Sequence, residues 1–64
     1  MDRASAIKLL PAMHAVAVRI RDDGGDDHLI AVAVDTDDDQ VPMLLTIAER
    51  KLATLMARPS RLGY

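Results

Sequence analysis

Two runs of alternating side chains constrain the fold of this chain more than any other feature. In residues 14–21 and again in residues 29–36, valine or isoleucine alternates with alanine or with polar residues. A period of two places successive side chains on opposite faces of a β-strand. Gly24 and Gly25 lie between the two runs, and glycine supplies the backbone freedom that a tight turn needs. The pattern therefore predicts an antiparallel β-hairpin.

Two registers of this hairpin keep the branched side chains together on one face. The first register pairs Ile20 with Ile30. The second pairs Val18 with Ile30. It also brings Arg21 opposite an acid, Asp27. A slip of one residue would exchange the two faces of a strand. These two registers therefore both stay open, and registers shifted by one residue are excluded.

Helices are expected on both sides of the hairpin. Asp2 can cap a short N-terminal helix, because its carboxylate can accept a hydrogen bond from a backbone N–H of the first turn. The segment that starts near residue 40 carries its apolar side chains on one stripe at helical spacing, and Pro59 ends it. The prediction is an α/β (α+β) fold, a two-layer α-β-β-α module in one domain over residues 1–64, with a helix at about 2–10, strands at about 14–21 and 29–36, a helix at about 40–58 and a tail at 59–64.

The chain is short and has few large apolar side chains with which to build a stable core. It has 64 residues and no cysteine, phenylalanine or tryptophan. Chains of this size bury only about 60% of their unfolded surface, and an isolated hairpin leaves both of its edges unpaired. These points predict a homodimer that joins the hairpins edge to edge or stacks their alanine faces. The predicted interface residues are Ala15, Ala17, Leu29, Ala31, Ala33, Met43 and Ile47.

Charge is divided between two parts of the chain. Residues 22–39 hold eight aspartates and no lysine or arginine, whereas residues 50–61 hold four basic residues and no acid. Charged ends of this kind and a terminal tyrosine are suited to contacts with another protein. We therefore expect a small homodimeric regulatory or accessory protein that acts by protein–protein interaction. The candidate partner-binding residues are Asp22, Asp23, Asp26, Asp27, Arg58, Arg61 and Tyr64.

Nucleic-acid binding is the alternative function. The net charge of −2 argues against a general polyanion binder, because affinity for nucleic acid depends largely on basic side chains that neutralise phosphates. Arg19 and Arg21 would still project from the hairpin, and Arg50 and Lys51 belong to the basic C-terminal end. The alternative is therefore a dimeric nucleic-acid-binding regulator that uses this basic end.

No catalytic or metal motif stands out in the sequence. A calcium loop that began at Asp35 would have Gln40 where glycine is needed and Thr46 where a bidentate glutamate is needed. His14 and His28 would lie at opposite ends of the hairpin, too far apart to share one metal. The serines have no histidine at a spacing suited to nucleophilic catalysis. The expectation is a protein that is not an enzyme and holds no cofactor.

The N-terminal region does not read as a targeting segment. Asp2, Lys8 and Pro11 interrupt its apolar stretch, and no run approaches the eighteen apolar residues typical of a membrane span. A cytoplasmic location is therefore expected, with no membrane partner. The high content of alanine, aspartate and arginine indicates a GC-rich genome, of bacterial or phage origin.

Overall fold

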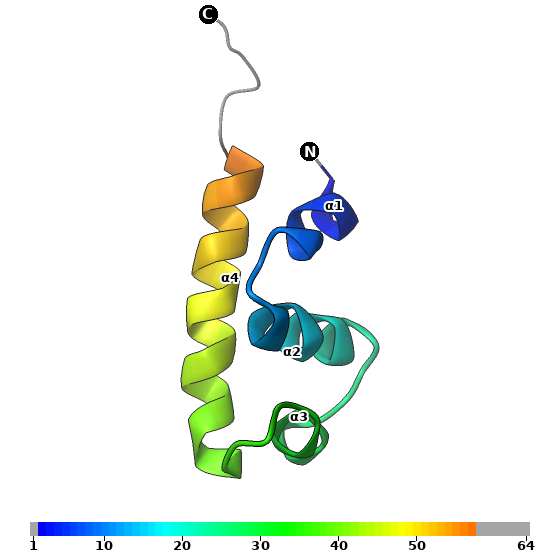
Figure 1. Ribbon diagram of the computed structural model, residues 1–64, viewed down its shortest axis with the longest axis vertical. Coiled ribbons are helices and arrows are strands. Elements are labelled where there is room, and N and C mark those ends of the chain that lie inside the picture. The colour runs from blue at the N-terminus through cyan, green and yellow to red at the C-terminus, as the bar shows by residue number, and fades with distance from the viewer. Residues whose placement is uncertain (1, 58–64) are drawn as a thin grey trace, which may run out of the picture.

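Helices alone form the regular structure of residues 2–57, the part of the chain that the computed structural model describes (Figure 1). Both alternating runs are helical, so the predicted β-hairpin and the α/β (α+β) class are wrong. The two hairpin registers and a dimer joined through sheet edges depend on this hairpin, so they are wrong as well. The elements in chain order are α1 (Arg3–Lys8), α2 (Ala12–Asp22), α3 (Asp27–Val34), the short 3-10 helix η1 (Asp38–Gln40) and α4 (Val41–Ala57).

The burial pattern of α3 shows why a period of two was misleading. A strand would place Ile30, Val32 and Val34 on one face. In the structure Ile30 is fully buried, whereas 67% of Val32 is exposed. Burial instead follows helical spacing, with Ile30 and Ala31 inside and Val34 packed against the same cluster one turn later. Alanine at alternate positions is the residue most favourable to a helix, and valine costs a helix only a few tenths of a kcal/mol more.

The acidic glycine segment ends one helix and begins the next. Gly24 has a positive φ of 93°, and its N–H donates to the carbonyl of Arg21. The N–H of Gly25 donates to the carbonyl of Ile20 at 2.8 Å. These two bonds form a Schellman motif, a common ending of an α-helix. Asp26 then caps α3 by accepting a hydrogen bond from the N–H of Leu29 at 2.9 Å.

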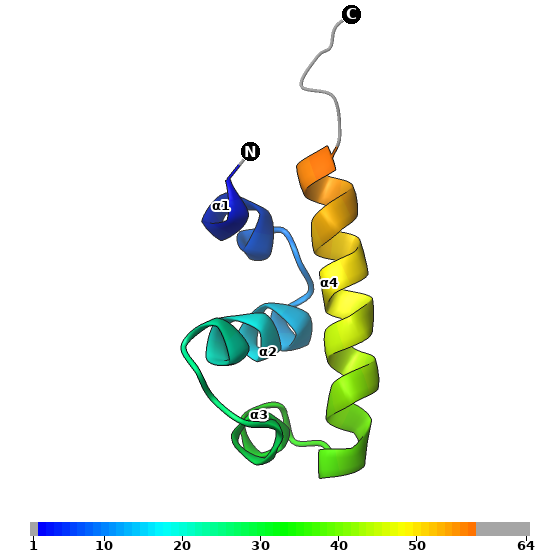
Figure 2. The ribbon, with the colours of Figure 1, turned by 180° about the vertical axis from the view of Figure 1, so that it is seen from behind.

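The core is divided into two clusters, and α4 contributes to both. Figures 1 and 2 show α1, α2 and α3 arranged one after another along one side of α4. Near the middle and the C-terminal half of α4, Ala48 and Leu52 pack with side chains of α1 and α2. Near its start, Val41 packs with Ala17 of α2 and with Ile30 of α3. No helix within residues 2–57 is both long enough and apolar enough to cross a membrane.

We predict that Gly25→Ala destabilises the fold by about 2 kcal/mol, because an added Cβ overpacks the turn. This Cβ would overlap Cγ2 of Ile20 and would lie 3.1 Å from Cδ2 of Leu29. Urea unfolding followed by circular dichroism measures the loss. The control is the same substitution in an Ile20→Ala background, where the clashing Cγ2 is absent and the cost of Gly25→Ala should be smaller. An equal loss in both backgrounds would contradict the steric explanation.

Candidate functional site

One face of α4 leaves large apolar side chains in contact with solvent. Met43 is 61% exposed and Ile47 is 39% exposed. At about 100° per residue, Met43, Ile47, Arg50 and Thr54 fall within a sector about 60° wide. We call these four residues the outer stripe of α4. Met43 and Ile47 are its two apolar members, and neighbouring exposed apolar side chains are typical of contact sites.

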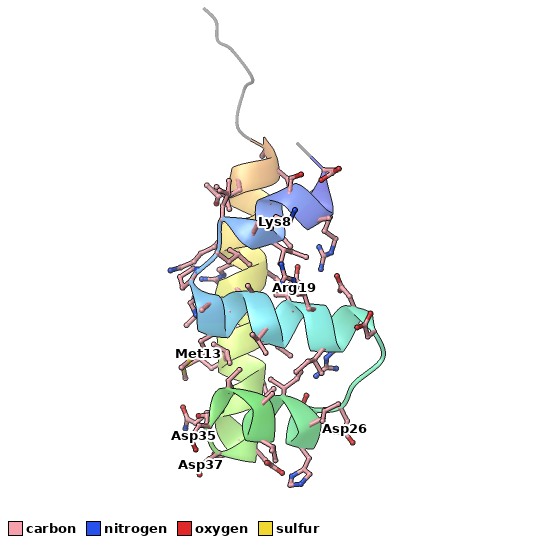
Figure 3. All side chains as sticks on the ribbon, turned by 45° about the vertical axis from the view of Figure 1, so that its right-hand side comes forward. Lys8, Met13, Arg19, Asp26, Asp35 and Asp37 are labelled. Atoms are coloured by element: carbon pink, nitrogen blue, oxygen red, sulfur yellow. The ribbon has the colours of Figure 1, made fainter. Side chains whose placement is uncertain are left out.

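A hollow of about 200 Å³ lies beside the N-terminal half of the outer stripe. Met13 borders it from the start of α2, is 49% exposed, and projects at the edge of the molecule in Figure 3. Methionine side chains are flexible and polarisable, so they adapt to differently shaped partners. We call this site the methionine hollow. It is lined by Met13, Thr36, Gln40, Met43, Leu44 and Ile47.

A larger hollow of about 430 Å³ continues along α4 towards its C-terminus. The loop between α1 and α2 forms one wall, and two successive turns of α4 form the other. Basic and apolar groups line it together, with no acid among them. We call it the basic hollow. Its lining residues are Leu9, Leu10, Pro11, Arg50, Lys51, Thr54 and Leu55.

Acids lie at the other end of this surface. Asp37, Asp38 and Asp39 precede α4, and Asp35 and Asp37 lie at the same end of the molecule in Figure 3. Asp38 lies 3.2 Å from Nδ1 of His28, with both side chains largely exposed. Asp39 makes no ion pair with any residue of 2–57. The surface along α4 is therefore acidic at one end, apolar in the middle and basic at the other end.

The predicted dimer-interface residues do not share one surface. Ala15, Ala17 and Ala31 are at most 7% exposed, because they pack against the chain's own helices. Leu29 and Ala33 are exposed on α3. Met43 and Ile47 are exposed on α4, as the helical wheel of the sequence indicates. The small-residue face of a hairpin thus has no counterpart in the structure.

The predicted partner-binding aspartates mostly serve the fold. Asp22 pairs with Arg3, and Asp27 pairs with Arg21. Asp26 is the cap of α3, whereas Asp23 is exposed at the end of α2. The remaining residues of this prediction, Arg58, Arg61 and Tyr64, lie outside the described part of the chain.

The residues of the nucleic-acid alternative are also separated. Arg21 is paired with Asp27, and Arg19 borders a separate hollow together with Asp22 and other residues. Only Arg50 and Lys51 lie side by side, in the basic hollow. Many DNA-binding domains use a helix-turn-helix motif, in which a short turn with glycine joins two helices. The order of α2, the glycine turn and α3 matches this motif. The second helix, α3, however has the sequence DHLIAVAV, which offers no lysine or arginine to a groove.

The histidines do not form a metal centre with other side chains. Within residues 2–57, no three His, Asp or Glu side chains are grouped in a way that could hold a metal ion. His14 is partly buried on α2, and its Nδ1 has no hydrogen-bond partner. His28 lies at the surface of α3, beside Asp38.

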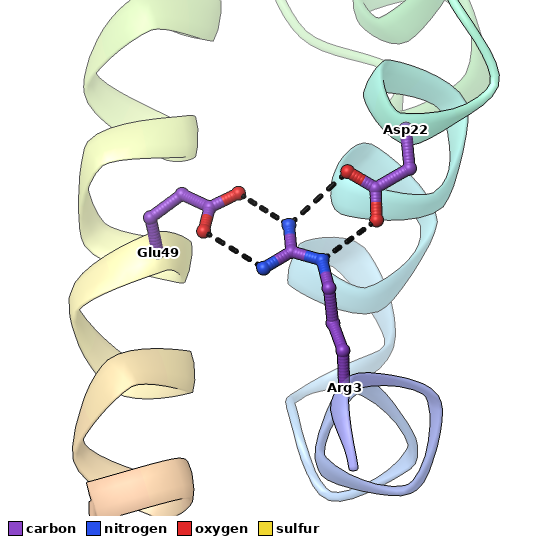
Figure 4. Close-up of polar contacts among 3 residues, drawn as sticks. All are labelled: Arg3, Asp22 and Glu49. Carbon is purple, nitrogen blue, oxygen red and sulfur yellow. Dashed lines mark hydrogen bonds and ion pairs between the residues drawn. The ribbon is translucent and has the colours of Figure 1, made fainter.

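The strongest charged cluster joins three helices around Arg3 (Figure 4). The guanidinium of Arg3 donates to both carboxylate oxygens of Asp22, at 2.9 and 3.1 Å. It also donates to Glu49 of α4, at 3.0 and 3.5 Å. The hydrogen bonds from Arg3 lower the pKa of the Asp22 carboxyl group, and burial acts in the opposite direction. Because four of the five N–H groups of Arg3 donate within the chain, the cluster orients α4 and does not offer a binding site.

Sequence reasoning missed Arg3, Leu9 and Met13 as parts of this region. Arg3 and Glu49 are separated by 46 positions, and no local pattern connects them. Leu9 and Met13 flank Pro11, where the helical spacing is interrupted. Their exposure follows only from how α1 and α2 pack on α4.

The chain matches no protein-family model, and neither a curated protein nor a solved structure matches it. Its function is therefore inferred from its own geometry.

We predict that Asp22→Asn lowers the free energy of unfolding by about 1 kcal/mol at pH 7, the upper range for an exposed ion pair. The pKa of Asp22 is lowered below its ordinary value of 3.8 in the folded chain. The contribution of the pair is thus complete above this value, and it is lost as the pH falls through the lowered pKa. Urea unfolding between pH 7 and pH 2 measures the difference from the unsubstituted chain.

Asp23→Asn is the control for this pair. Asp23 follows Asp22 at the same end of α2, so both carboxylates meet the same end of the helix dipole. Asp23 makes no ion pair within residues 2–57. A loss that is as large in the control, or that persists at pH 2, would argue against the Arg3 pair as its cause.

Proposed function

We propose that this chain is a homodimeric protein–protein interaction module, a small regulatory or accessory protein whose contact surface is the outer stripe of α4. The observation that carries this proposal is the exposure of Met43 and Ile47 beside the methionine hollow. Full burial of one large apolar side chain is worth roughly 1.5–3 kcal/mol. Association that covers Met13, Met43 and Ile47 on each of two chains recovers a large part of that free energy.

The size of the core supports the same proposal. The largest fully buried side chains within residues 2–57 are Ile30, Leu52, Val18 and Val41. A core of this size leaves a domain with little stability in reserve. A partner that binds only the folded chain adds to its stability by mass action. Self-association therefore gives the chain both a contact surface and a more stable fold.

Nucleic-acid binding has less support. The helix that would enter a groove is α3, which is capped by Asp26 and begins at Asp27. Aspartates at this point would face phosphates and repel them. The two basic residues that do lie together, Arg50 and Lys51, share their hollow with leucines. A groove that combines basic and apolar side chains is better suited to a protein.

We predict that the unsubstituted chain sediments at twice the 7.0 kDa of one chain and that Met43→Lys sediments as a single chain. The lysine would place a charge in the middle of the apolar contact. Met56→Lys is the matched control, because Met56 is 41% exposed but lies on another side of α4. Sedimentation equilibrium from micromolar to millimolar concentrations makes the comparison, with the dimer mass expected at the upper end of this range. A single-chain mass for the unsubstituted protein at all of these concentrations would contradict the proposed function.

We also predict that mixed-sequence duplex DNA at low salt shows no retardation by the chain. Nonspecific binding to DNA depends on released counterions and is strongest under this condition. Gel retardation at rising salt concentration measures it. Strong binding that weakens steeply with salt would favour the nucleic-acid alternative over the protein-binding module.

A further inference from the structure

The outer stripe of α4 and the acidic segment before it are complementary to themselves when one copy is reversed. Met43, Ile47 and Arg50 follow one another in α4 at helical spacings of four and three residues, which keeps them near one face. Asp39 lies in η1, the 3-10 helix directly before α4, and so marks the acidic end of the same surface. The midpoint between Met43 and Ile47 is position 45. The midpoint between Asp39 and Arg50 falls within one residue of the same level. A two-fold rotation about an axis at this level places Met43 opposite Ile47 of the second copy, and Asp39 opposite Arg50.

We infer that two copies of this chain pair α4 against α4 in antiparallel orientation, across a two-fold axis level with residue 45. The inference rests on the proposed function, for which it names the partner and the register. In this arrangement Met43 packs against the partner's Ile47, and Ile47 against the partner's Met43. Arg50 lies opposite the partner's Asp39, and the same contact is repeated on the other side of the axis.

Parallel pairing of the same stripes would be opposed by charge. It would place Asp39 against the partner's Asp39 and Arg50 against the partner's Arg50. Like charges opposite one another disfavour an interface, and complementary charges select its register. Within residues 2–57 Asp39 and Arg50 have no ion-pair partner, so both are available for contact with a second copy. The antiparallel arrangement is the one that satisfies the apolar centre and both charged ends.

The two hollows fit this arrangement as well. The methionine hollow lies near the axis, where Met13 and Leu44 flank the site that the partner's Ile47 would fill. The basic hollow lies level with the acidic end of the reversed partner. Arg50 and Lys51 therefore meet the aspartates that precede the partner's α4. The acidic and basic ends of this surface are separated in one chain, and the dimer brings them together.

The length of α4 limits the strength of this contact. Its 17 residues span about 25 Å at 1.5 Å per residue. A single helix pair of that length buries less than the standard interface area of about 800 Å² per partner. We therefore expect a dimer that dissociates at micromolar concentrations and strengthens at low salt, where the charged ends are screened least.

A charge exchange tests the register. Asp39→Arg alone and Arg50→Asp alone each place two like pairs in the dimer, and we expect each to raise the dissociation constant about tenfold at low salt. The double variant restores opposite charges in the same places, so its dissociation constant should return to within about threefold of the original. Analytical ultracentrifugation at low and high salt measures all four proteins, and far-UV circular dichroism verifies that each is folded.

A distance measurement tests the orientation independently. The sequence has no cysteine, so Ala57→Cys introduces a single site for a spin label at the exposed last residue of α4, two turns beyond Arg50. Antiparallel pairing about residue 45 separates the two labelled positions by about 36 Å along the helices, whereas parallel pairing places them within about 20 Å. Pulsed electron paramagnetic resonance distinguishes the two values.

The outcomes separate this inference from the proposed function. A short label distance, or a dimer whose charge-exchanged double variant stays as weak as the single variants, would overturn the antiparallel register and leave the homodimer standing. A chain that stays single at all concentrations would overturn both. A long distance together with recovery in the double variant is the result expected.

Discussion

The packing of three short helices on α4 is the interaction on which the rest of this structure depends. The short helices have 6, 11 and 8 residues. Isolated helices of fewer than about 12–15 residues are marginal in water, because few hydrogen bonds repay the cost of the first turn. Leu52 and Ala48 hold α1 and α2, and Val41 holds the contact with α2 and α3. The cooperativity of folding therefore resides in α4.

The choice of small side chains at these contacts explains what the surface displays. Alanines occupy many of the most buried positions, and they let helix axes approach closely. A core made this way is narrow and has little room for long side chains. Met13, Met43 and Ile47 are therefore left at the edge of the helix contacts, where they form the middle of the candidate site. The small side chains at the helix contacts therefore account both for the narrow core and for the exposed apolar stripe.

Sequence reasoning was successful where a helix had a stripe and a cap, and it failed where alanine alternated with valine. Asp2 does accept a hydrogen bond from the N–H of Ser5, and the apolar stripe of residues 40–58 does mark a helix, Val41–Ala57. The middle of the chain has a period of two on paper, yet no third strand was available to cover a hairpin. Asp26 before an alanine-rich run was the local signal of a helix start.

The two helix endings at Gly24 and Asp35 differ in how clearly the local sequence predicts them. Gly24 supplies the positive φ of the first Schellman ending, and glycine at this position is a usual helix ending. The second ending uses Asp35 at a φ of 58°, a conformation that aspartate adopts more often than most residues but less readily than glycine. Thr36 donates to the carbonyl of Ala31 there, as the motif requires. The contacts of Arg3, which reach across 46 positions, are in contrast beyond any local pattern.

The polarity of α4 links folding to the proposed contact. Acids near the start of a helix and bases near its end are favoured by the helix dipole, whatever the helix binds. The three aspartates before α4 follow that rule, whereas Arg50 and Lys51 lie about two turns before its last residue and no base lies in its last turn. A helix with acids before its start and bases in its second half is complementary to a copy of itself only when the copy is reversed. The acidic start that helps α4 to form therefore also favours the direction in which two copies would meet, and the exposed apolar residues between the charges supply the reason for them to meet at all.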